Sequence, residues 1–267
     1  MKTLTSLENP LVKSIRRLQQ KPAHRADGGM VLEGVKLANE ALTSGIEITQ
    51  ALLSVDFASR PTGRALLQRL TAAGVPCAAV NERIFRRCSS LDSPEGALLV
   101  GRSPLRALSD SAAELGDLVG VVAGVQDPGN LGAIARVAEA AGASAMVVCR
   151  ETAHPFHPKA LRGSMGSLLR LPVVDGGDAQ AAFEYLKNKG FSLAACVPRG
   201  GVDFRKAKLA RPLALVLGSE SSGLSRNLLQ TCDLHLSVPM KGRIDSLNVA
   251  VVAGLVLYEA ARQRGAV

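Results

Sequence analysis

The chain has 267 residues, of which 47% are hydrophobic and 21% charged, a composition that supports a folded core and excludes an intrinsically disordered protein. Its formal net charge of +9 favours a polyanionic partner. The longest apolar run, residues 249–258, is too short to span a bilayer, and the first residues have charges and an early proline where a secretory signal would be apolar. We therefore expect a cytoplasmic protein without a membrane segment.

The positive charge is concentrated at the start of the chain. Residues 1–25 contain six basic side chains and one acidic side chain, Glu8. Lys13, Arg16 and Arg17 fall on one face of a predicted helix, and Arg25 follows. Such a run is often only a solvated helix face, but contact with RNA phosphates is the interpretation that we favour.

Residues 1–105 are predicted to form a small α/β domain. Short apolar runs (MVLEG, ITQALLS, PCAAV, GALLV) alternate with helical stretches around 34–44 and 62–73. Residues 106–117 are rich in Ser and Ala and lack β-branched residues, which favours a linker. Residues 118–267 then form a second domain.

The second domain shows a clearer alternation of strands and helices. Continuous apolar strands are expected at 119–125, 145–149, 192–197, 213–217 and 234–238, and helices at 132–141, 179–189, 224–231 and 247–263. This pattern predicts an α/β fold with a mainly parallel sheet and helices on both faces. Ligands of such sheets bind beyond the carboxyl ends of the strands, which here means the loops 126–130, 218–223 and 239–246.

The first of these loops has the sequence DPGNLGAIAR, residues 127–136. Asp-Pro-Gly favours a turn, and Asn130 is placed to cap the helix that follows. Arg136, further along this helix, could meet a phosphate or a ribose hydroxyl. Taken alone, Asn130 could be only a helix cap and Arg136 only a surface charge.

The second loop, LGSESSGL at residues 217–224, is bracketed by glycines. Gly218 would allow close approach of a ligand to the backbone, and Gly223 would permit the turn into the next helix. The loop matches neither the Rossmann nor the Walker phosphate fingerprint, which argues against a nicotinamide-dependent oxidoreductase. Glu220 stands among small residues that leave room for a ligand.

The third segment, VPMKGRIDSLNVA at residues 238–250, leads into the last helix. Ser246 is the expected N-cap of this helix. The helix is apolar nearly all round, so we expect it to be buried in the core or against a second chain. Asn248 would then be a buried amide in need of partners.

The cysteines and histidines indicate no further site. The five cysteines are scattered at spacings that fit neither a metal site nor a CxxC motif, which favours reduced thiols. His154 and His157 lack a third ligand nearby, so no metal is expected.

Together, the three segments resemble the signature motifs of the SpoU (TrmH-like) family of SPOUT RNA 2′-O-ribose methyltransferases. The resemblance spans residues 119–264, and three long motifs in the same order are highly specific. The N-terminal NPLVKSIRRLQ and MVLEGVKLANEAL are similar to the ribosomal-protein-like RNA-binding domain of the rRNA-modifying members. The resemblance implies a C-terminal trefoil knot, a homodimer, S-adenosyl-L-methionine as cofactor and RNA as substrate.

The resemblance also implies residue roles. Arg136 would act on the ribose 2′-hydroxyl, and the polar residues that fix Arg136 and the ribose would be Asn130, Glu220, Ser246 and Asn248. The cofactor would be held, largely by backbone, at Gly218, Val238, Met240 and Leu247. A guanidinium stays protonated in proteins, so Arg136 is better interpreted as an electrostatic group that orients the hydroxyl and stabilises developing alkoxide charge than as a base.

Two classes of function remain open at this point. The first is an RNA 2′-O-methyltransferase, with 23S ribosomal RNA favoured over tRNA because of the N-terminal domain. The second is a non-catalytic RNA-binding or assembly factor with the same fold.

Overall fold

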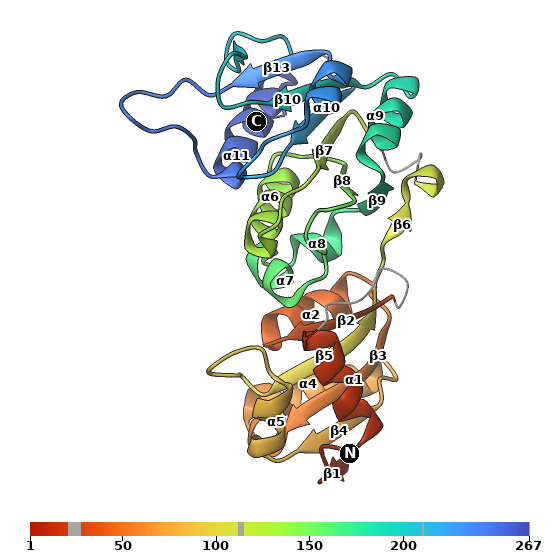
Figure 1. Ribbon diagram of the computed structural model, residues 1–267. Helices are drawn as coiled ribbons and strands as arrows, with labels where there is room; N and C mark the ends of the chain where they lie inside the picture. Colours follow the sequence, from red (N-terminus) through yellow and green to blue (C-terminus); the bar gives the residue numbers. More distant parts are fainter. Residues whose placement is uncertain (21–27, 112–114, 210, 267) are drawn as a thin grey trace. The chain divides into compact units, whose positions relative to one another are not determined.

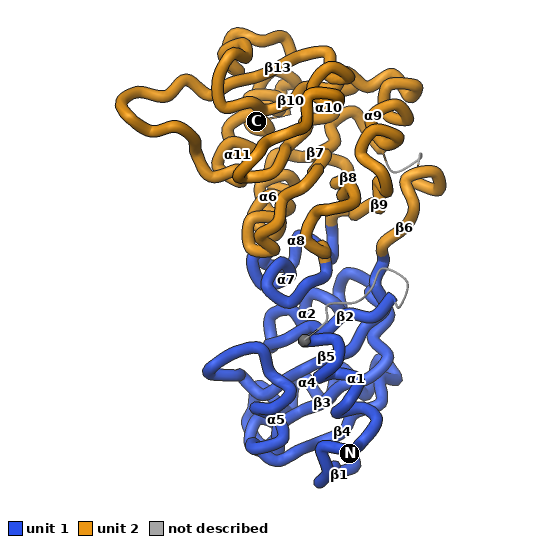
Figure 2. The backbone as a smooth tube through the Cα atoms, viewed as in Figure 1, with its two compact units in different colours: residues 1–104, 156–170 blue, residues 105–155, 171–267 orange. Residues whose placement is uncertain are grey.

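The computed structural model describes residues 1–20, 28–111, 115–209 and 211–266. These residues form two compact units (Figure 2). Unit 1 contains residues 1–104 and 156–170, and unit 2 contains residues 105–155 and 171–267. The chain therefore leaves unit 2 once, after residue 155, and returns to it at residue 171.

Unit 1 is built on a five-stranded sheet with the order β1-β4-β3-β5-β2. The strands are β1 (Lys2–Leu4), β2 (Gly29–Glu33), β3 (Ile48–Ser54), β4 (Cys77–Val80) and β5 (Ala97–Arg102). Strands β1, β4 and β3 are parallel, whereas β5 is antiparallel to both β3 and β2. The small α/β domain predicted from the apolar runs is thus present.

Helices cover both faces of this sheet. Helices α1 (Pro10–Gln20) and α5 (Glu82–Cys88) share one core with it, and α2 (Val35–Thr43) and α4 (Pro61–Ala72) pack against each other on the opposite face (Figure 1). The short α3 (Val55–Ser59) precedes α4. Helices α7 (Pro158–Ser164) and α8 (Ser167–Arg170) also belong to unit 1, where α7 contacts β2.

A buried carboxylate ties the loop after α5 to the sheet of unit 1. Glu33, at the end of β2, is only 5% exposed. It accepts hydrogen bonds from Gln19 Nε2 (3.1 Å), from Ser90 N (3.0 Å) and Oγ (2.7 Å), and from Ser89 Oγ. Removing the carboxylate would take an acceptor away from all of these donors.

We expect Glu33→Ala to lower the free energy of unfolding by about 3 kcal/mol, because it removes a buried carboxylate that accepts several partly buried hydrogen bonds. Urea unfolding of the full chain, followed by circular dichroism, measures this loss. Glu47→Ala is the matched control, since the Glu47–Arg102 ion pair (2.8 Å) is exposed and should contribute less than about 1 kcal/mol. Equal midpoints for the two variants would show that the Glu33 cluster does not stabilise the unit.

Unit 2 contains an eight-stranded sheet in which every neighbouring pair is parallel, with the order β11-β13-β10-β12-β7-β8-β9-β6. Its strands are β6 (Arg106–Ala107), β7 (Leu118–Val122), β8 (Ala145–Cys149), β9 (Val173–Gly177), β10 (Ser192–Cys196), β11 (Val202–Asp203), β12 (Leu213–Leu217) and β13 (Leu234–Ser237). The predicted parallel α/β fold is confirmed. The trefoil knot stays a prediction.

Helices cover both faces of the large sheet. Helices α9 (Ala179–Asn188) and α10 (Arg226–Thr231) pack on one face, and their apolar residues join the core beneath them. Helices α6 (Pro128–Ala140) and α11 (Val249–Gln263) contact each other on the other face (Figure 1). In the described part of the chain, no helix is long and apolar enough to cross a membrane.

The segment 106–117 differs from the expected linker. Its first residues form β6, which pairs with β9, and a 3-10 helix, Leu108–Asp110, whose Leu108 is buried in the core. A two-residue strand is too short to give a periodic signal, so composition alone could not distinguish it from a linker.

Candidate active site

A chain of hydrogen bonds joins the three motifs at the carboxyl end of the large sheet. Asn130, in the first turn of α6, donates from Nδ2 to Oε1 of Glu220 (3.0 Å). Asn248, which precedes α11, donates from its own Nδ2 to Oδ1 of Asn130 (2.9 Å). Three of the five predicted catalytic residues therefore meet, although they are far apart in the sequence.

The backbone of the first loop also holds Glu220. The Gln126 N–H donates to Glu220 Oε2 (3.2 Å), so both carboxylate oxygens are engaged. Burial alone would raise the pKa of Glu220, but hydrogen bonds from Asn130 and from the backbone outweigh it and lower this pKa below its ordinary value. Glu220 is therefore a carboxylate at neutral pH.

The caps of the two helices differ from those predicted. Asp127, not Asn130, caps α6: its carboxylate accepts the Asn130 N–H (2.9 Å), and Pro128 occupies the first turn. Asn248, not Ser246, caps α11 by accepting the Ala250 N–H (2.9 Å). Proline at the first helical position needs no N–H partner, which lets α6 begin earlier than expected. Asn248 is also exposed and not buried.

Between the first two loops lies a crevice of about 550 Å³, lined by Gln126, Asp127, Asn130, Ser219, Glu220 and Ser221. Its volume is within the roughly 300–1,000 Å³ common for ligand sites. Two of the three loops expected at the ligand site, 126–130 and 218–223, thus line this crevice, whereas loop 239–246 contributes none of these lining residues. Carboxylate, amide and hydroxyl groups make it suited to a polar ligand.

Arg136 does not take part in the hydrogen-bonded chain. It is exposed on α6, roughly 9 Å along the helix axis from Asn130 and about a third of a turn around it. In the described part of the chain, its guanidinium has no hydrogen bond or ion pair. Its side chain is therefore available to a ligand or to another molecule.

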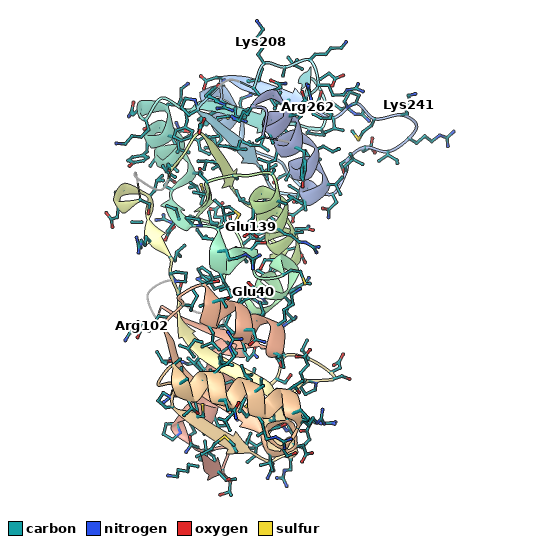
Figure 3. The ribbon with its side chains drawn as sticks, turned by 180° about the vertical axis from the view of Figure 1, so that it is seen from behind. Glu40, Arg102, Glu139, Lys208, Lys241 and Arg262 are labelled. Carbon is teal, nitrogen blue, oxygen red and sulfur yellow. The ribbon has the colours of Figure 1, made fainter. Side chains whose placement is uncertain are left out.

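The predicted cofactor residues lie on different segments. Gly218 is buried at the end of β12, and Val238 follows β13, which is separated from β12 by β10. Met240 and Leu247 belong to the loop 239–248, which extends away from the sheet (Figure 1) and has Lys241 near its tip (Figure 3). Ser246 is exposed in the same loop, where Arg199 forms an ion pair with Asp245 (2.6 Å).

The tight packing of the loop 218–224 requires a glycine at position 218. A Cβ atom on it would lie 2.7 Å from the Gly223 carbonyl carbon and 2.8 Å from the Leu224 nitrogen. Ser219 and Gly223 close the loop through two backbone hydrogen bonds, and Gly223 has a φ of 65°. The close approach predicted at Gly218 is thus made by the chain itself, whereas the turn predicted at Gly223 is present.

The predicted RNA-binding residues lie in unit 1. Lys13 and Arg17 are exposed on α1, while Arg16 is half-buried; Arg25 lies outside the described residues. Lys13 forms an ion pair with Glu8 (2.5 Å). The neighbouring α5 adds the exposed Arg83, Arg86 and Arg87, which the sequence analysis did not single out. Three arginines within five residues of one short helix are the sequence signal that could have indicated them.

Comparison with known proteins assigns the two parts of the chain. Residues 117–258 match the sequence model of the SpoU rRNA Methylase family, and residues 9–99 match that of the MRM3-like substrate binding domain. The chain belongs to the SpoU rRNA methylase family. Both family matches agree with the resemblance carried by the three motifs and by the N-terminal segment.

Individual relatives extend the family match over nearly the whole chain. The 23S rRNA (guanosine(2553)-2'-O)-methyltransferase RlmP of Bacillus subtilis is 31% identical over 97% of this chain and 98% of its own. The AdoMet-bound rRNA methyltransferase of Sinorhizobium meliloti is 31% identical, covers 98% of this chain and 97% of its own, and has a TM-score of 0.86. The TrmH/SpoU tRNA modifying enzyme of A. aeolicus covers only 59% of this chain and 82% of its own, at 27% identity and a TM-score of 0.51.

Proposed function

We propose that this SpoU family member transfers a methyl group from S-adenosyl-L-methionine to a ribose 2′-hydroxyl of 23S ribosomal RNA in the cytoplasm. The observation that carries this proposal is the Asn248–Asn130–Glu220 chain, which joins all three motifs in one crevice. A non-catalytic relative would have no need to keep such a network of exposed polar groups. Similarity to rRNA enzymes along the whole chain favours rRNA over tRNA.

The chain's own residues would position the reacting groups. The sulfonium cofactor supplies an electrophilic methyl group when bound, and Gly218, Val238, Met240 and Leu247 would hold it. Asn130, Glu220, Ser246 and Asn248 would orient the ribose by hydrogen bonds. Arg136 would place positive charge beside the 2′-oxygen as the hydroxyl proton passes to solvent water, and this charge would stabilise the developing alkoxide.

Incubation of the protein with labelled S-adenosyl-L-methionine and either 23S rRNA or total tRNA tests the proposal directly. Label at a ribose 2′-oxygen of the rRNA is the expected result. Label in tRNA alone would overturn the choice of substrate. Tight RNA binding without label would instead indicate a non-catalytic RNA-binding factor.

The pH dependence tests the role of Glu220. Because its folded-state pKa is lowered, Glu220 stays ionised from pH 8 down to its ordinary carboxylate pKa, and its interactions are lost only as the pH falls further. We expect Glu220→Gln to lower kcat/KM by about tenfold to hundredfold, equally at pH 8 and pH 5, since an amide has one acceptor oxygen and cannot accept from both Asn130 Nδ2 and the Gln126 N–H. An acid limb near pH 6 that this variant removes would contradict the assignment.

We also propose that the basic face of α1 and α5, defined by Lys13, Arg17, Arg83, Arg86 and Arg87, contacts RNA phosphates. The two helices share a core, so their exposed cations lie on one side of unit 1. Unlike Arg86, which forms an ion pair with Glu82 (3.2 Å), Arg83 and Arg87 have no ion pair within the described residues. The pair is therefore available to an anionic partner.

We expect Arg83→Ala/Arg87→Ala to weaken rRNA binding and to reduce the slope of log K against log salt by about two, one for each lost phosphate contact. Filter binding between 50 and 200 mM salt measures both effects, since two phosphate contacts change affinity by about tenfold over this range. Arg102→Ala, which removes an exposed arginine on β5, is the control and should leave the slope unchanged. An unchanged slope in the double variant would exclude this face.

A homodimer is the third part of the proposal. On α11 the apolar side chains of Val251, Leu255 and Tyr258 are 50%, 40% and 44% exposed. Their spacing places them on one stripe of the helix, whose opposite face packs on the core. A contiguous apolar stripe of this kind is typical of an interface, and a second copy of the chain would cover it.

A further inference from the structure

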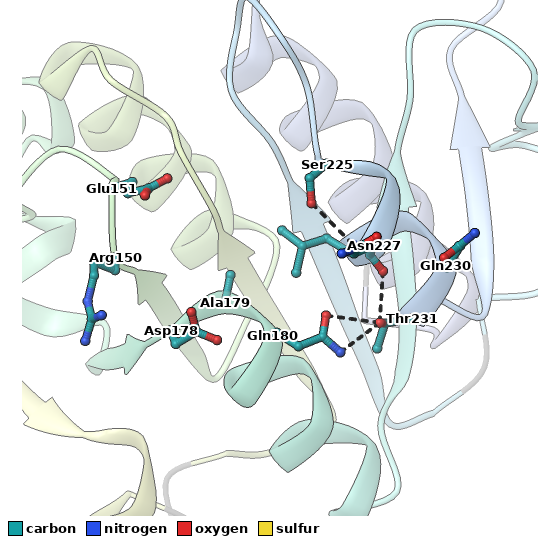
Figure 4. Close-up of a pocket in the computed structure, with 10 residues that line it drawn as sticks. Arg150, Glu151, Asp178, Ala179, Gln180, Ser225, Asn227, Gln230 and Thr231 are labelled. Carbon is teal, nitrogen blue, oxygen red and sulfur yellow. Dashed lines mark hydrogen bonds between the residues drawn. The ribbon is translucent and has the colours of Figure 1, made fainter.

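A second cavity lies beside the crevice, at the carboxyl ends of β8 and β9. It has a volume of about 650 Å³ and is formed only by residues of unit 2 (Figure 4). Polar side chains dominate its lining, among them Arg150, Asp178, Gln180, Ser225, Asn227 and Gln230. We call it the amide pocket.

The chemistry of the lining selects the kind of ligand. Amide side chains carry a donor and an acceptor next to each other, and the pocket has three of them. The edges of nucleobases present the same mixed pattern. Two carboxylates, Glu151 and Asp178, disfavour a bare phosphate, whereas the Arg150 guanidinium could stack on a base. The lining therefore fits a neutral, planar and polar group.

Some side chains of the amide pocket are fixed by hydrogen bonds, and others are available to bind a ligand. Gln180 Nε2 donates to Thr231 Oγ1 (3.1 Å) and to Glu184 Oε1 (2.9 Å), which ties α9 to α10. The side chains of Asn227 and Gln230 have no hydrogen bond within the part of the chain that the structure describes. The pocket thus combines a fixed wall with two unused amides.

One residue connects the amide pocket to the catalytic crevice. Gln126 donates its backbone N–H to Glu220 in the crevice and its side-chain N–H to the carbonyl of Glu151 in the pocket lining. Glu151 has a φ of 68°, a conformation that non-glycine residues adopt uncommonly. Gln126 therefore links the lining of the pocket to the carboxylate that accepts the Asn130 hydrogen bond in the crevice.

We propose that the amide pocket binds a nucleobase of the RNA directly next to the nucleotide whose ribose is methylated. This inference rests on the proposed function, and it adds a determinant of sequence specificity to it. Single-stranded RNA can present an unstacked base to such a pocket, where hydrogen bonds read its edge. A base bound there would also fix the position of the neighbouring ribose in the crevice.

The test uses the full chain and starts with the wild-type protein on 23S rRNA, so that the modified nucleotide is mapped first. Absence of label would refute the proposed function itself. On an RNA fragment around the mapped nucleotide, we expect Asn227→Ala/Gln230→Ala to lower kcat/KM by about tenfold to hundredfold, mainly through KM. Asn188→Ala, an exposed amide at the end of α9 outside the pocket, is the matched control and should have no effect.

Abasic substitution of the RNA separates base recognition from a structural effect. The base is removed from the 5′ neighbour of the target nucleotide in one RNA and from the 3′ neighbour in another. One of these RNAs should lower wild-type kcat/KM by a similar factor and should cause no further loss in the double variant. Additive losses, or unchanged kinetics of the double variant while the wild type methylates, would overturn the assignment. A parallel loss of S-adenosyl-L-methionine affinity in calorimetry would overturn it as well, because the pocket would then serve the cofactor.

Discussion

Replacement of Arg136 by alanine is expected to reduce methyl transfer by about 10³-fold, while the affinity for S-adenosyl-L-methionine stays within twofold. The reason is the position of this residue. Arg136 is exposed on α6 and makes no hydrogen bond with the described residues, so its loss leaves the Asn248–Asn130–Glu220 chain intact. Its contribution would arise only as charge develops on the ribose oxygen. Transfer of labelled methyl groups and calorimetric cofactor binding measure the two quantities separately.

Two further variants show whether a positive charge at this position is sufficient and whether the effect is specific to it. Arg136→Lys keeps a cation but loses the planar fork, so it should retain part of the activity. Lys208→Ala removes an exposed cation elsewhere in unit 2 (Figure 3) and should retain all of it. Turnover of Arg136→Ala within tenfold of the wild type would exclude any role for this residue in stabilising the transition state.

The sequence predicts the strands of the large sheet better than the ends of its helices. The strands β8 and β12 have the predicted bounds, because five consecutive apolar residues between turn residues leave few alternatives. Strand β9 was not predicted, since Val173 and Val174 are followed by an acidic residue and two glycines. Helix α6 begins four residues early because Pro128 can start a helix, which periodicity does not record.

The sequence indicates which residues belong to the candidate site, but it does not indicate which of them contact one another. The motifs identify Asn130, Glu220 and Asn248, yet only the order of the strands shows that they meet. Strands β7 and β12 are neighbours in the sheet although α6, β8, β9 and β10 separate them in the chain. The same long-range pairing creates the amide pocket, whose residues belong to no motif, so no local pattern could indicate it.

The apolar stripe of α11 gives the second large expected effect. Leu255→Asp should convert the proposed dimer into a monomer of 27.8 kDa, because a second copy could not cover the stripe without burying an unpaired charge. The charge would meet water in the free chain, where Leu255 is already 40% exposed, so the fold itself should survive. Light scattering after size exclusion measures the mass, and circular dichroism measures the fold.

Val55→Asp provides the comparison that makes this result specific. Val55 is 45% exposed, nearly as much as Leu255, but it lies in unit 1 at the start of α3, where an acidic residue is well tolerated. A variant with the same chemistry and similar exposure should therefore keep the mass of the wild type. If both variants and the wild type have a mass of 27.8 kDa, no second copy covers α11. If Leu255→Asp alone is monomeric and its activity falls with its mass, the crevice requires the partner that this stripe binds.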